Sequence, residues 1–172
     1  MKKTFETLDE ELLPIVYTTH VRPLLEYGNA IWHPRYTSDI IKVERVQRRA
    51  TKIIPTIRDK PYEDRLKKLK LYSMEYRRKR GDMIQVYKIL KGIDNIEADI
   101  FFVPGNPRTR GHSKKLYKPK CKKEVRKNVF SNRIIDNWNT LTEDIVSSKT
   151  LKTFKERLDK HWEKFWYKIG IK

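Results

Sequence analysis

The chain contains 172 residues, of which 38% are hydrophobic, a composition that supports a buried core and excludes disorder over most of its length. No apolar run approaches the roughly 18 residues that a membrane-spanning helix needs, and no signal peptide is readable at the start. The single cysteine, Cys121, excludes an internal disulfide framework and indicates a reducing, intracellular compartment.

The formal net charge of +18 is concentrated in one part of the chain. Residues 101–133 contain eleven basic residues, and Glu124 is the one acid among them. A field of one sign is usually neutralised by an anionic partner, most often a polyphosphate. RNA and DNA are therefore the expected partners, and no membrane partner is expected.

Helical periodicity runs through most of the chain and predicts an all-α fold, a bundle of about five to seven helices. Residues 8–32 are predicted to form one or two helices, with Pro14 and Pro23 as starts or kinks. The next helix is predicted over residues 39–54, with Ser38 as its N-cap.

The predicted helix over residues 39–54 separates into an apolar and a basic face at about 100° per residue. The apolar face, expected to be buried, contains Ile40, Val43, Val46, Ala50, Ile53 and Ile54. The opposite face contains Lys42, Arg45, Arg48, Arg49 and Lys52.

Four further helical segments are predicted. A short helix begins at Pro61, and Ser73 caps a longer helix that ends near Gly92. After residues 126–141, which are again helical, a last helix spans residues 149–166. Its apolar stripe consists of Leu151, Phe154, Leu158, Trp162, Phe165 and Trp166, and its alternating charges indicate a solvated outer face.

Residues 103–123 lose this periodicity and are rich in Pro, Gly and Lys, which predicts a basic loop or arm, the least ordered segment in the interior of the chain. The arm is either a disordered tail or a segment that orders on nucleic acid by phosphate contacts and stacking. The basic run 77–80 has two interpretations as well. Its side chains bind phosphates, or they belong to the solvent-exposed face of their helix.

The nucleic-acid-binding residues are predicted from these basic segments, without any metal ligand or cofactor. They are Arg45, Arg48, Arg49, Lys52, Arg77, Arg78, Arg80, Arg108, Arg110, His112, Lys114, Lys115, Tyr117 and Arg126.

Catalysis has little support in the sequence. Metal-dependent nucleotidyl transfer needs clustered carboxylates, and here the acids are interleaved with Lys and Arg and no adjacent Asp pair occurs. Two alternatives stay open beside nucleic-acid binding. One is a folded remnant that binds nothing, and the other is a metal-dependent nuclease that uses scattered acids such as Glu26, Glu63 and Asp82.

Six phrases, in order and at similar spacing, resemble one family. They are VRPLLEYGNAIWHP, VERVQRRATKII, YEDRLKKLKLYSMEYRRKRGDMIQVYKILKG, TRGHSKKL, VRKNVFSNRIIDNWNTL and FKERLDKHW. Together they look like the C-terminal part of the reverse transcriptase of non-LTR retrotransposons of the jockey and chicken-repeat (LINE) type, from about Tyr17 to Trp162. Thr142 stands where the family often has a Pro after its Trp-Asn-x-Leu phrase.

The resemblance implies thumb-like helices over residues 1–92, a basic arm over 93–126, and a C-terminal helical region over 127–172 that packs on the first. It also implies a role in holding template RNA and primer–template duplex within a nuclear or cytoplasmic ribonucleoprotein. The family's aromatic–Ala–Asp–Asp catalytic turn and its endonuclease are missing from this sequence, so a truncated copy or fragment without polymerase activity of its own is expected.

Overall fold

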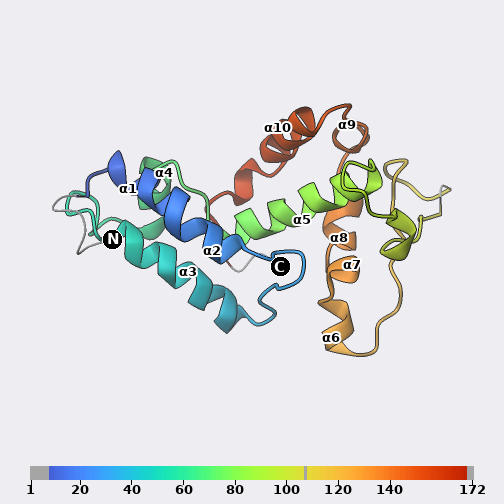
Figure 1. Ribbon diagram of the computed structural model, residues 1–172, viewed down its shortest axis with the longest axis horizontal. Coiled ribbons are helices and arrows are strands. Elements are labelled where there is room, and N and C mark those ends of the chain that lie inside the picture. Colours follow the sequence, from blue (N-terminus) through green and yellow to red (C-terminus); the bar gives the residue numbers. More distant parts are fainter. Residues whose placement is uncertain (1–7, 107, 170–172) are drawn as a thin grey trace. The chain divides into compact units, whose positions relative to one another are not determined.

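The computed structural model describes residues 8–106 and 108–169, which are helical apart from connecting loops and one isolated antiparallel bridge between Pro104 and Leu116 (Figure 1). This confirms the predicted all-α class. The helical elements are α1 (Leu12–Val16), the π-helical turn η1 (Tyr17–Val21), α2 (Arg22–Glu26), α3 (Thr37–Thr51), α4 (Tyr62–Lys68), α5 (Met74–Leu90), η2 (Ala98–Ile100), α6 (Glu124–Lys127), α7 (Phe130–Arg133), α8 (Ile135–Asn139), α9 (Glu143–Val146), α10 (Leu151–His161) and η3 (Glu163–Phe165).

The chain forms two compact units that interleave along the sequence. Unit 1 contains the described residues of 1–29, 34–78 and 164–169, and unit 2 contains residues 30–33 and the described residues of 79–163. The expected division at residue 92 therefore falls instead inside α5, between Arg78 and Lys79.

The core of unit 1 is built from short helices that each contribute one apolar face. Leu13 of α1 and Tyr17 of η1 are completely buried, as are Ile57 and Leu66 from the segment that follows α3. The last described residues also belong here, because Ser73 N–H donates to the carbonyl of Trp166 at 2.8 Å. Phe165 and Trp166 thus lie outside the stripe of the last helix in which the sequence placed them.

The buried face of α3 is more polar than predicted, although Ala50 and, just beyond the helix, Ile54 are buried as expected. Glu44 and Gln47 are each only 1% exposed, whereas Val46, predicted to be buried, is 39% exposed. Ser38 is not the N-cap either, because α3 begins at Thr37 and no side chain caps it.

Glu44 is buried because it binds the start of another helix. One carboxylate oxygen accepts the N–H of Met74, the first residue of α5, at 2.8 Å, and the other accepts the Tyr62 hydroxyl at 2.5 Å. Ser73 caps the same helix end, as predicted, by accepting the Tyr76 N–H at 3.2 Å. The positive end of the α5 dipole therefore faces a carboxylate supplied by α3.

The buried Glu44 is expected to make stability depend on pH. Burial raises the pKa of Glu44 above its ordinary value, and hydrogen bonds from Tyr62 and Met74 offset part of that effect. A raised folded-state pKa contributes stability that is complete below the unfolded value of about 4.3 and is lost as pH rises through the folded pKa. In urea titrations at several pH values, the free energy of unfolding of the wild type relative to Glu44→Gln should therefore fall as pH rises from 4. If the free energy of unfolding of the wild type relative to Glu44→Gln instead rose with pH, the raised pKa of Glu44 would be contradicted.

Unit 2 is centred on aromatic residues from α5, α8 and α10. Phe154 is completely buried and stacks on Tyr87 with ring centroids 4.2 Å apart, and Trp138 lies 6.1 Å from the same Phe154 ring. Leu158 and Trp162 are buried on the same side of α10, as predicted. These contacts fix Trp138 at the end of α8, and the same residue also binds the basic arm.

Candidate nucleic-acid interface

The basic face of α3 is exposed along its whole length. Its side chains at spacings of three and four residues lie along one side of the helix, over about 10 Å at 1.5 Å per residue. None of the described residues forms an ion pair or hydrogen bond with the side chains of Arg45, Arg49 or Lys52. We call this set the α3 stripe, and its members are Arg45, Arg48, Arg49 and Lys52.

Arg48 is held in place by an aromatic ring. Its guanidinium lies 4.8 Å from the ring centroid of Tyr62, whose hydroxyl is fixed by Glu44. The buried Arg65 lies 5.4 Å from the same ring. This support could not be predicted from the sequence, because Tyr62 belongs to α4 and its contact with α3 leaves no local pattern.

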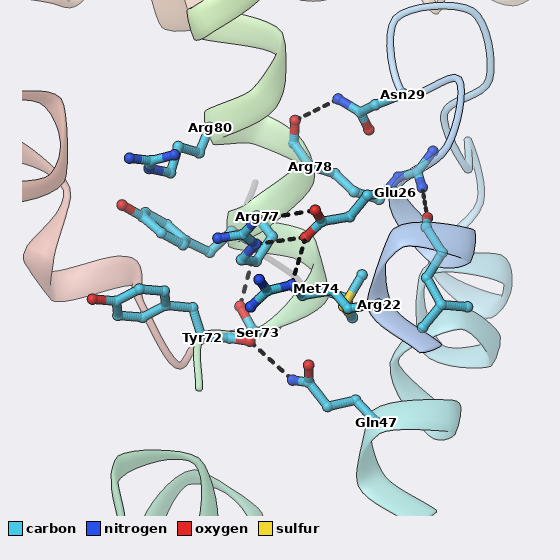
Figure 2. Close-up of polar contacts among 12 residues, drawn as sticks. Arg22, Glu26, Asn29, Gln47, Tyr72, Ser73, Met74, Arg77, Arg78 and Arg80 are labelled. Atoms are coloured by element: carbon cyan, nitrogen blue, oxygen red, sulfur yellow. Dashed lines mark hydrogen bonds and ion pairs between the residues drawn. The ribbon is translucent and has the colours of Figure 1, made fainter. Parts of the chain in front are cut away.

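The basic run at the start of α5 is occupied by intramolecular contacts, which corrects the prediction that it grips phosphates. Arg77 forms a two-point ion pair with Glu26, at 2.5 and 3.0 Å, and Arg78 is 1% exposed and donates to the carbonyl of Leu25 (Figure 2). Arg80 likewise pairs with Asp159, at 2.5 Å. We therefore remove Arg77, Arg78 and Arg80 from the candidate surface.

The arm is anchored to α8 by side chains. The amide group of Asn139 accepts the Leu116 N–H at 2.9 Å and donates to the Leu116 carbonyl at 2.8 Å. The indole N–H of Trp138 donates to the Lys114 carbonyl, at 2.8 Å. A paired segment results, in which Gly105 N–H donates to the Lys115 carbonyl and the arm folds back on itself. The prediction of a poorly ordered arm is therefore wrong for residues 112–117.

His112 is one of these anchors and not a surface residue. It is 5% exposed, its Nε2 lies 3.0 Å from the Trp138 carbonyl, and its Nδ1 accepts the Lys114 N–H at 3.2 Å. These contacts fit a neutral ring that carries its proton on Nε2, and burial lowers the pKa of His112 accordingly. A nucleotide contact by His112 is therefore excluded in this arrangement.

Two of the predicted binding residues remain exposed at the tip of the arm. Arg108 and Arg110 are exposed, and no described residue pairs with their side chains. Lys114 and Lys115 are half-buried, and the Lys115 amine donates to the Arg110 carbonyl. Gly111 has φ of +122°, a value that side-chain-bearing residues rarely adopt, and thus permits the turn at the tip. Tyr117 and Arg126 are exposed nearby in the sequence, beside a groove described below.

The anchors predict slow amide exchange in the arm. Leu116 and Tyr117 N–H groups, bonded to Asn139 and to the Val103 carbonyl, should exchange more slowly than Arg110 N–H by at least tenfold. Replacing Asn139 by Ala should abolish the difference at Leu116, whereas Asn137→Ala, a neighbouring half-buried amide on α8, should preserve it. Equal exchange rates across residues 110–117 in the wild type would contradict the anchored arm.

Two of the three acids considered for a nuclease are paired with arginines. Glu26 binds Arg77, and the buried Asp82 binds Arg133 with contacts of 2.9 and 3.1 Å. Glu63 is exposed in the first turn of α4. Within the described ranges, no three His, Cys, Asp or Glu side chains are grouped so that they could hold a metal ion.

Comparisons with known proteins add no relative. No family model, curated protein or solved structure matches this chain. Among the described helices, none is both long and apolar enough to cross a membrane.

Proposed function

We propose that this chain is a nucleic-acid-binding module without catalysis of its own, which holds RNA and primer–template duplex by their phosphates. The observation that carries the proposal is the α3 stripe, in which three exposed cations have no partner in the described part of the chain. An unpaired row of charges repels itself, so an anionic backbone along it lowers the energy of the folded protein. RNA and DNA supply such a backbone, with one charge per about 3.4 Å along each strand.

The side chains on the stripe favour backbone contact over sequence recognition. Arginine and lysine donate to phosphate oxygens, and the stripe contains none of the Asn, Gln, Ser or Thr side chains that commonly read base edges. Gln47 and Thr51 belong to the same helix but are buried on its other face. Weak sequence preference is therefore part of the proposal.

The resemblance stated above gives the module a place in a larger protein. We infer that it corresponds to the thumb and the region after it in a LINE-type reverse transcriptase, acting in a ribonucleoprotein. In such an enzyme, helices that follow the polymerase palm need charge to hold template and primer without reading them. The α3 stripe and the arm tip, each within its own unit, are suited to that task.

The salt dependence of binding tests the proposal. If about six phosphates are neutralised, log affinity for a labelled RNA hairpin should fall with log salt with a slope of about −4 to −5. The double variant Arg108→Gln/Arg110→Gln should flatten this slope by about one to two units, because each residue accounts for at most one phosphate. The measurement is a fluorescence anisotropy titration at four salt concentrations. Absence of binding at low salt would support the folded remnant instead.

A further inference from the structure

Unit 2 contains an apolar groove that the proposed function does not use. Its volume is about 600 Å³, and it is lined by the segment around η2, by the arm after its anchor, and by α6 and α7. Six of its lining side chains are large, hydrophobic and exposed: Ile100, Phe101, Val103, Tyr117, Val125 and Val129. Ile100 and Val125 are each about 70% exposed, at 71% and 70%. Such a gathering of exposed apolar side chains indicates a binding surface, because isolated ones are the rule elsewhere.

The lining of the groove also contains cations. Lys123 and Arg126 line it, and in the described part of the chain no acid pairs with either side chain. Their neighbours Lys118 and Lys127 are different, because they already pair with Asp136 and Glu124. The groove therefore combines exposed apolar side chains with two cations that are available to an acidic partner.

A nucleic acid and an acidic protein are the two anionic partners that these cations allow, and the other lining residues distinguish between them. Bases stack on aromatic or guanidinium planes, whereas four of the six exposed side chains are the aliphatic Ile100, Val103, Val125 and Val129. Aliphatic grooves accept the apolar face of an amphipathic helix, with anchors at positions i, i+3 or i+4, and i+7. A second copy of the chain is a poor occupant, because each copy has a net charge of +18.

We propose that this groove binds an acidic amphipathic helix of a partner protein, with its apolar anchors on Val125 and Ile100 and its carboxylates beside Lys123 and Arg126. This interaction is independent of nucleic-acid binding by the α3 stripe. The module would then hold a nucleic acid and a protein at the same time.

The test uses the full chain and synthetic helical peptides. A peptide pool keeps Leu at i, i+3 or i+4, and i+7 and varies the flanking positions among Glu, Gln and Lys. Selection on the wild type should enrich Glu, and the best peptide should bind at least tenfold more tightly than a scramble of equal charge. Ile100→Ser/Val125→Ser should weaken binding at least tenfold. Ile93→Ser/Ile96→Ser, at exposed apolar positions that do not line the groove, should leave it unchanged.

Charge reversal separates the outcomes. The variant Lys123→Glu/Arg126→Glu should bind the selected acidic peptide at least tenfold more weakly than the wild type does. It should bind the counterpart peptide, with Lys in place of Glu, more tightly. RNA binding by the serine variant should match that of the wild type. No enrichment of Glu, or equal binding of the scrambled peptide, would overturn the proposal. A serine variant that loses RNA affinity instead would show that bases occupy the groove, and would also overturn it.

Discussion

Replacing Phe154 by Ala is expected to lower the free energy of unfolding by about 3–5 kcal/mol, the range measured when a fully buried aromatic side chain is truncated. Phe154 is completely buried, and it stacks on Tyr87 at 4.2 Å between centroids. Truncation leaves a cavity between α5, α8 and α10 that the surrounding rings fill only in part. Urea denaturation of the full chain, followed by circular dichroism, measures the effect.

The matched control lies on the same helix. Glu156 is exposed on α10, and Glu156→Ala should change the free energy of unfolding by less than about 0.5 kcal/mol. RNA affinity of folded Phe154→Ala should equal that of the wild type. A Phe154→Ala protein with unchanged stability would contradict the placement of Phe154 in the core, whether or not it still binds RNA.

Local patterns predicted the helices and the core of unit 2. The four-residue spacing of Phe154, Leu158 and Trp162 requires only the geometry of one helix. The end of α5 was also predictable, since Gly92 adopts φ of +63° just beyond it. The buried face of α3 was not predictable in this way. Glu44 is buried because it binds the N-terminus of α5, a contact thirty residues away in the sequence.

The residues of the candidate site divide in the same way, into those placed by one helix and those placed by contacts with distant segments. The cations of the α3 stripe lie on one helix, so their common face could be predicted from the sequence alone. Partners of the other predicted residues come from distant segments. Arg78 is buried against the Leu25 carbonyl, and the arm is held by Asn139, 23 residues beyond Leu116. Neither segment carries a local pattern that indicates this contact.

Neutralising the α3 stripe is expected to have the largest effect on binding. The variant Arg45→Gln/Arg48→Gln/Arg49→Gln/Lys52→Gln removes four exposed charges while leaving Glu44 and Gln47 in place on the buried face. If each charge neutralises one phosphate, the salt slope for a labelled RNA hairpin should flatten by about three units, and affinity at moderate salt should fall roughly 100-fold. The melting temperature should stay within a few degrees of the wild type.

The direct test of the α3 stripe compares this variant with one of equal net charge. The control variant replaces Lys149, Lys152, Lys155 and Lys160, on or beside α10, by Gln, and it removes four positive charges from the charge-balanced last helix. Both proteins are titrated against the same hairpin over the same salt series. We predict a slope flattened by about three units for the α3 variant and by less than one unit for the α10 control. Equal slopes for the two variants would mean that total charge alone drives association, and would contradict a phosphate-binding surface on α3.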